Sequence, residues 1–161
     1  MDTINVLVTG VGAPGIMGTL DAISKLEEEV KLVGVDISKD SVGKYLVDEY
    51  EIVPRPNTKE FIPRLLEIVK KYKVQVIVPQ VTKELEPLAK NKELFAKENC
   101  TVLVNNYEAL QTLNNKYMLL AAFKEAGITT PDYELVKTKE ELKAYCAKQN
   151  YPENRVVVKL P

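Results

Sequence analysis

Short apolar runs rich in β-branched residues alternate along this chain with stretches of helical periodicity. Helical spacing is clearest for Phe61, Leu65, Val69 and Tyr72. Strands that are apolar along their whole length are typical of a parallel sheet with helices on both faces, because neither face then meets water. The alternation therefore predicts an α/β fold with a Rossmann-like parallel sheet. The expected strands are residues 4–9, 30–35, 50–53, 74–78 and 101–104.

Beyond residue 104 the pattern changes to a series of helix-capping signals. Asparagine pairs at 105–106 and 114–115 each precede a short helical run, and Gly127 follows the second run as a C-cap glycine would. Thr138 and Glu141 have the spacing of a capping box. Residues 133–136 and 155–160 are expected as strands around that helix. We therefore expect a first domain over 1–113 and the incomplete start of an α+β domain over 114–161.

The composition excludes several classes of function. The 22 basic and 23 acidic residues are interspersed, so we expect no binding of nucleic acid. The chain has no histidine, which excludes histidine-based triads and zinc sites from it, and Cys100 and Cys146 form no CxxC motif. No signal peptide is recognisable, and no apolar stretch approaches the ~20 residues of a membrane span. We expect a cytoplasmic protein that does not bind membranes.

A glycine-rich loop follows the first expected strand, in the sequence TGVGAPGIMG. Gly10, Gly12 and Gly15 satisfy the pattern GxGxxG, which allows a tight turn and close approach of a ligand to the backbone. The following helix start offers amide hydrogens to an anion. Asp36, at the end of the second strand, lies where a dinucleotide-binding fold holds the ribose. The alternative is structural: such a loop also simply begins a doubly wound domain, and Asp36 begins a turn.

A second candidate loop follows the fourth expected strand and contains Thr82 and Glu84. In open α/β sheets, ligands bind beyond the carboxyl ends of the strands, so a substrate is expected to bridge this loop and the glycine loop. The alternative makes Thr82 a helix N-cap and Glu84 a carboxylate favoured by the dipole of the first helical turn.

The C-terminal third resembles the opening of an ATP-grasp fold. The resemblance rests on NNKYMLLAAFKEAGITTPDYELVKTKEEL followed by RVVVKLP. In that family a lysine at a helix start and a lysine in a V(I/V)KP strand contact the phosphates of ATP, and Lys116 and Lys159 match them. The proline comes one residue late here, at Pro161. The segments VLVTGVGAPG, DEYEIVP and VIVPQVTKELEPLAKN resemble the domain that precedes ATP-grasp, most closely in the large subunit of carbamoyl-phosphate synthase and its relatives.

The resemblance implies an ATP- and Mg²⁺-dependent ligase that activates a carboxylate as an acyl phosphate and couples it to an amine or another nucleophile. The glycine-rich loop over the triphosphate and the acidic magnesium ligands follow the VKP strand in the family. This chain is therefore expected to be an N-terminal segment, inactive alone, that holds substrate-binding residues and two phosphate lysines. Its partners are expected to be a small carboxylate, the remainder of the ATP-grasp chain and a second copy in a homodimer. Thr82 departs from the aspartate that relatives often carry, and no catalytic residue is assigned.

Two other functions remain open at this point. The fingerprint of Gly10, Gly12, Gly15 and Asp36 also suits a module that binds NAD or NADP. A regulatory domain without catalysis, whose sheet packs on a partner, is the third hypothesis.

Overall fold

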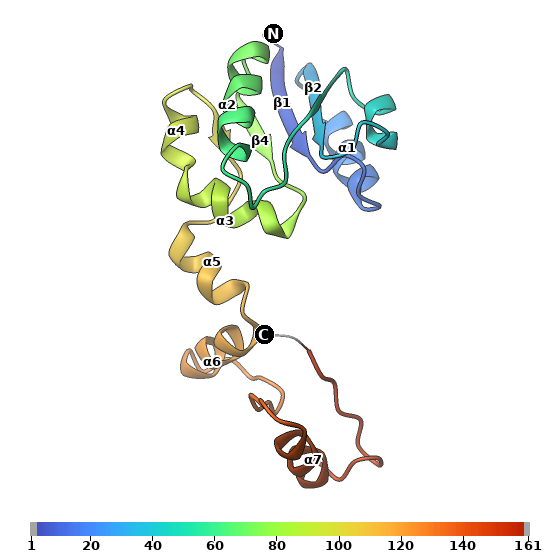
Figure 1. Ribbon diagram of the computed structural model, residues 1–161, viewed down its shortest axis with the longest axis vertical. Helices are drawn as coiled ribbons and strands as arrows, with labels where there is room; N and C mark the ends of the chain where they lie inside the picture. The colour runs from blue at the N-terminus through green and yellow to red at the C-terminus, as the bar shows by residue number, and fades with distance from the viewer. Residues whose placement is uncertain (1–2, 160–161) are drawn as a thin grey trace. The chain divides into compact units, whose positions relative to one another are not determined.

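The computed structural model describes residues 3–159 of the chain, which form two units, Met1–Tyr107 and Glu108–Pro161 (Figure 1). Each unit is described by itself. The expected division into 1–113 and 114–161 stays a prediction. No helix within residues 3–159 is long and apolar enough to cross a bilayer.

The first unit contains a five-stranded parallel sheet in the order β3-β2-β1-β4-β5. The central strand β1 pairs with β2 and β4, so that Val8 lies beside Gly34 on one side and Val78 on the other. All five expected apolar runs form strands, and the predicted Rossmann-like α/β class is confirmed. The strands are β1 (Ile4–Thr9), β2 (Val30–Asp36), β3 (Glu49–Ile52), β4 (Val76–Val78) and β5 (Thr101–Val102).

Helices cover both faces of this sheet. Successive residues of a strand point to opposite faces, so neighbouring residues of β1 belong to different core clusters. Leu7 belongs to a core cluster with Phe61 and Leu65 of α2, whereas Val6 and Val8 belong to a second cluster with Ile16 and Leu20 of α1. The elements of the first unit besides the strands are α1 (Ile16–Ser24), η1 (Val42–Tyr45), α2 (Phe61–Tyr72), α3 (Thr82–Lys90), α4 (Lys92–Ala96) and the first residue of α5 (Tyr107–Leu113).

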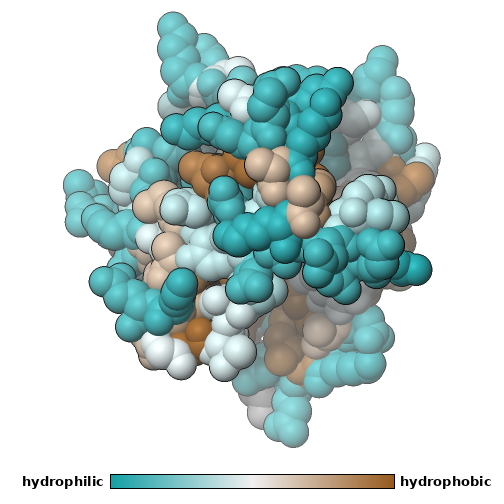
Figure 2. All heavy atoms as spheres, turned by 90° about the horizontal axis from the view of Figure 1, so that it is seen from below, coloured by the Kyte–Doolittle hydropathy of each residue, from teal (hydrophilic) through white to brown (hydrophobic). Residues whose placement is uncertain are grey.

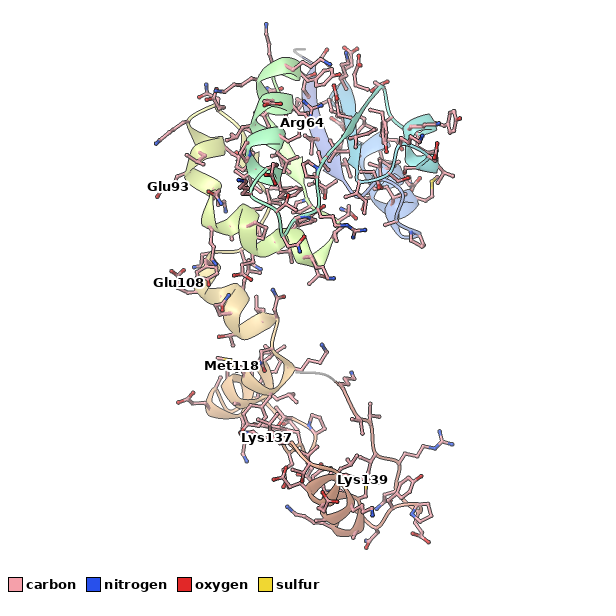
Figure 3. All side chains as sticks on the ribbon, in the orientation of Figure 1. Arg64, Glu93, Glu108, Met118, Lys137 and Lys139 are labelled. Carbon is pink, nitrogen blue, oxygen red and sulfur yellow. The ribbon has the colours of Figure 1, made fainter. Side chains whose placement is uncertain are left out.

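A charged cluster around Glu51 attaches α2 to the edge strand β3. The carboxylate accepts hydrogen bonds from Lys71 and Arg64 at 2.7 and 2.6 Å, and from the hydroxyl of Tyr72 at 2.9 Å. Figure 3 labels Arg64 on α2, from which it also donates to the carbonyl of Ile52. The Lys71 hydrogen bond is the main cause that lowers the pKa of Glu51. Charges along an edge strand also discourage pairing with other strands.

The second unit has the capped helices that the sequence predicts. Asn115 precedes α6 (Lys116–Glu125) and accepts a hydrogen bond from the amide of Met118 at 3.0 Å. Gly127 follows that helix with φ of +73°, as a C-cap glycine does. Thr138 and Glu141 form the predicted capping box of α7 (Lys139–Lys148), whose first residue is labelled in Figure 3.

The two strands expected in this unit are not formed. Residues 133–136 and 155–159 have no regular secondary structure, and Leu160 and Pro161 lie outside the described residues. A strand requires a neighbour for its backbone hydrogen bonds, and residues 108–159 contain no strand that would supply one. The apolar pattern of 155–158 favours strand pairing, but no strand within residues 3–159 pairs with it.

The second unit also has almost no core of its own. Leu110 is the single buried residue among 108–159, and large apolar side chains such as Tyr117, Met118 and Val157 are exposed. Figure 2 shows apolar patches between the hydrophilic side chains of the visible face. This arrangement is typical of a segment that buries its apolar side chains against other protein.

Gly18→Ala is expected to raise the free energy of unfolding by about 0.5–1 kcal/mol, because glycine inside a helix loses more backbone entropy on folding than alanine. Gly18 lies within α1, and a Cβ there would meet no atom within 4 Å. Urea denaturation followed by circular dichroism at 222 nm measures the change.

Gly10→Ala is the matched control and is expected to destabilise, since Gly10 has φ of +58°. A destabilised Gly18→Ala protein would contradict the packing described for α1.

Candidate functional site

The glycine loop connects β1 to α1 at the carboxyl edge of the sheet. Gly10 has a positive φ, and a Cβ on it would lie 2.6 Å from Cγ2 of Val81, just before α3. The loop closes with a hydrogen bond of 2.9 Å from the amide of Ala13 to the carbonyl of Gly10. Gly10 is therefore required by the turn and by its close approach to the loop between β4 and α3.

Gly12 is required by contacts within the protein. Its amide donates to Oδ2 of Asp36 at 2.8 Å, and a Cβ on Gly12 would lie 2.5 Å from Oγ of Ser41. Asp36 also accepts from the amide of Ser38 at 3.1 Å and from the hydroxyl of Ser41 at 3.4 Å. Protein donors thus occupy most of the acceptor positions of this carboxylate.

These contacts weigh against the dinucleotide hypothesis. The amide of Gly12, a donor that a pyrophosphate would need, is already bonded to Asp36. The same carboxylate places a negative charge beside the loop, which opposes a second anion there. In this structure the carboxylate of Asp36 supports the glycine loop through Gly12 and also accepts from the amide of Ser38, two residues on.

Gly15 is the open part of the loop. It is exposed, it precedes α1 with φ of −81° and no side-chain cap, and a Cβ there would meet nothing within 4 Å. The structure therefore shows no packing reason for a glycine at this position. Its expected role in ligand binding stays a prediction.

A buried hydrogen-bond chain joins the glycine loop region to the loop after β4. The hydroxyl of Thr9 donates to Oε2 of Glu84 and accepts from the backbone amide of Gln80 at 3.0 Å. The side-chain oxygen of Gln80 in turn accepts from the hydroxyl of Thr19 in α1 at 2.9 Å. Thr9 and Glu84 are both buried. Thr9 and Thr19 were not predicted as site residues, although a polar residue at the end of an apolar strand was a visible signal at Thr9.

Burial changes the acidity of Glu84. Desolvation is the main cause that raises its pKa to about 6, and the negative charge of Asp36 acts in the same direction. The hydrogen bond from Thr9 opposes this shift. The pKa of Glu84 is higher in the folded protein than the ordinary value of 4.5, so protonation of Glu84 stabilises the folded protein. This stabilisation is fully present below pH 4.5 and is lost as the pH rises through about 6.

The structure corrects the alternative interpretation of Thr82 and Glu84. Val81, in extended conformation, is the residue before α3, and Thr82 is the first helical residue and is exposed. Thr82 is therefore not the N-cap. Glu84 does lie in the first turn of α3, but its carboxylate accepts from Thr9 in the interior. Its interaction with the helix dipole therefore does not by itself explain why Glu84 is buried.

Lys116 and Lys159 both lie in the second unit. Lys116 is the first residue of α6, Lys159 lies in extended chain, and both side chains are exposed. Exposed ammonium groups suit phosphate binding. For a divalent metal, in contrast, residues 3–159 contain no group of three or more histidine, cysteine, aspartate or glutamate side chains that could hold one.

Comparison with known proteins identifies the first unit. Residues 6–103 match the protein family described as the PylC-like, N-terminal domain. The formate-dependent phosphoribosylglycinamide formyltransferase of Bacteroides fragilis is 29% identical over 139 residues, which are 86% of this chain and 34% of that protein.

Two solved structures share the fold. N5-carboxyaminoimidazole synthetase from Staphylococcus aureus, complexed with ADP, has a TM-score of 0.64 and 19% identity, over 92% of this chain and 36% of that one. The biotin carboxylase domain of Hydrogenobacter thermophilus 2-oxoglutarate carboxylase, with MgADP and bicarbonate, has a TM-score of 0.57 and 19% identity, over 92% of this chain and 33% of that one. The chain spans about a third of the length of these relatives.

Proposed function

This chain belongs to the PylC-like N-terminal domain family, and we propose from this premise that it is the substrate-side segment of an ATP-dependent ligase of the ATP-grasp superfamily. The ligase activates a carboxylate as an acyl phosphate and transfers the acyl group to an amine or a similar nucleophile. The family match, which covers nearly all of the first unit, is the observation that carries this proposal.

The first unit supplies the substrate-binding loops in this proposal. Gly15 and Thr82 are exposed where the strands of the sheet end, so these are the positions that reach a bound substrate. Gly10, Gly12, Asp36 and Glu84 belong to the same two loops, and their contacts with the protein give the loops their shape.

The second unit supplies Lys116 and Lys159 to the phosphates of ATP. Bound ATP with Mg²⁺ provides the phosphoryl group that activates the acid. The exposed lysines fit the phosphates, and the metal ligands are assigned to protein outside residues 3–159, where no suitable acidic cluster occurs. The exposed apolar side chains of this unit, Tyr117 and Met118 among them, are assigned to packing against the remainder of the ATP-grasp domain.

The acid is proposed to be small. The names of the relatives include a formate-dependent enzyme, a carboxyaminoimidazole synthetase and a biotin carboxylase domain bound to bicarbonate. Each name refers to a one-carbon acid or to the carboxyl group derived from one. The likeness to carbamoyl-phosphate synthase is general.

The full-length protein tests the proposal directly. With Mg²⁺ and ATP, formate or bicarbonate is expected to stimulate ADP formation, and hydroxylamine is expected to trap the acyl phosphate formed from formate. The 161-residue chain alone is expected to release almost no ADP. Absence of stimulation by any one-carbon acid would remove the proposal. Micromolar binding of NAD that is weakened by Asp36→Ala would favour the dinucleotide hypothesis instead.

Lys159→Ala in the full-length protein is expected to lower kcat/KM for ATP by about 10- to 100-fold, because a hydrogen bond to a charged group contributes roughly 1.5–3 kcal/mol. Steady-state ADP release measures the change. Lys143→Ala, which removes an exposed lysine from α7, is the control and is expected to leave kcat/KM unchanged. Equal values for both variants would contradict the assignment of Lys159.

A further inference from the structure

Glu84 is a buried carboxylate without a cationic partner. Its relative exposure is 3%, and none of the ion pairs within residues 3–159 includes it. Burial of an acid without a compensating cation costs stability, and an apolar residue would fill the same space without that cost. The position therefore calls for an explanation other than stability.

The hydrogen bonds of Glu84 suggest what that explanation is. Its carboxylate orients the hydroxyl of Thr9, so that the lone pairs of this oxygen face the backbone amide of Gln80. Gln80 is also held through its side chain by Thr19. The chain of bonds thus joins the ends of β1 and β4 and the helix α1, which are distant in sequence.

The loop that these bonds hold lies directly against the glycine loop. Val81 follows Gln80, and its Cγ2 would be 2.6 Å from a Cβ on Gly10. Because Val81 leaves no room even for a Cβ on Gly10, a movement of the loop after β4 towards Gly10 also displaces the glycine loop. Both loops carry the exposed positions assigned above to substrate binding.

We propose that Glu84 is a positioning residue that sets the distance between the two substrate-binding loops through Thr9 and Gln80 and does not itself touch the substrate. This inference rests on the proposed function, because it names the residue that shapes the same site. It differs from the expectation that Glu84 binds substrate directly, since the carboxylate is turned into the interior.

The charge of Glu84 provides an independent readout. Asp36 of β2 is the titratable group whose charge acts on Glu84. The neighbouring side chains from α1 and from the loop after β4 are Thr19 and Gln80, and both are neutral. Burial raises the pKa of Glu84 to about 6, so its charge changes between pH 5 and 7. The KM for the substrate is expected to change over the same range.

The test measures kcat and KM for the acid and the amine in the full-length ligase. Thr9→Val and Glu84→Ala are each expected to raise the KM for the acid or for the amine about tenfold, with little change in kcat. The KM of the double variant is expected to be no higher than that of either single variant. Glu84→Gln keeps an acceptor for Thr9 and is expected to show, at every pH, the KM that the wild type shows below pH 5, so that the pH dependence near 6 disappears.

A direct contact between Glu84 and substrate predicts a different result. Thr9→Val would then retain the wild-type KM, and the effects of Thr9→Val and Glu84→Ala would add; either outcome overturns the proposal. Hydrogen exchange of the unliganded protein tests the positioning role of Glu84 separately from the proposed ligase function. Thr9→Val is expected to accelerate amide exchange at residues 10–15 and 80–81 whether or not the protein is a ligase, and unchanged exchange there overturns the coupling.

Discussion

Phe61→Ala is expected to lower the free energy of unfolding of the first unit by about 3–5 kcal/mol, a large share of the roughly 5–15 kcal/mol that stabilises a typical domain. Phe61 begins α2, is completely buried, and lies in the larger core cluster with Leu7 of β1 and Val35 of β2. The cost combines the lost burial of the ring with the cavity left behind. Urea denaturation followed at 222 nm measures it.

Phe123→Ala is the matched control for this variant. Phe123 lies in α6 of the second unit and remains 38% exposed, so its removal is expected to change the free energy of unfolding by less than about 1 kcal/mol. Similar losses for the two phenylalanines would contradict the core described here. A large loss for Phe61→Ala alone would confirm that α2 anchors the sheet.

Gly43→Ala is expected to destabilise the first unit by about 3 kcal/mol, at the upper end of the cost of overpacking. Gly43 is buried in η1, and a Cβ on it would lie 2.5 Å from the carbonyl carbon of Val11 and closer still to its oxygen. The obstacle is backbone, so no side-chain rotation relieves it. Because Val11 precedes Gly12, the same substitution is expected to move the glycine loop.

Gly15→Ala is the control for Gly43→Ala, since no atom lies within 4 Å of a Cβ at this position. Its free energy of unfolding is expected to stay within about 0.5 kcal/mol of the wild type. If the proposed ligase activity is found in the full-length protein, its loss in Gly15→Ala with retained stability would mark Gly15 as a ligand contact. A stable Gly43→Ala protein would show that η1 and the glycine loop are not packed as described.

Much of the fold was predictable because its signals are local. The five apolar runs form the strands of the sheet, and the spacing from Phe61 to Tyr72 marks α2 correctly. The caps at Asn115 and Thr138 depend on side chains within three residues of their partners, so their pattern in the sequence is nearly the whole interaction. The expected strands are not formed at 133–136 and 155–159, because a strand needs the backbone hydrogen bonds of a neighbouring strand.

The candidate site was predictable only in part. The sequence identified the glycine loop, Asp36 and Glu84 as candidates for substrate binding and left a structural alternative open for each carboxylate. In the structure Asp36 accepts a hydrogen bond from the amide of Gly12, 24 residues away in the sequence. Glu84 accepts one from the hydroxyl of Thr9, 75 residues away. Neither pairing has a periodic or local signature, since both depend on which strands become neighbours.

The sequence by itself determined the α/β class, the positions of the strands and the helix caps, because periodicity and capping act over a few residues. The order β3-β2-β1-β4-β5 was decided only in the tertiary structure. That order places the end of β1 beside the end of β4, and so brings Thr9 to Glu84 and Gly10 to Val81. Long-range burial then removed Glu84 from water, which gave an ordinary carboxyl group its raised pKa and its place between two loops.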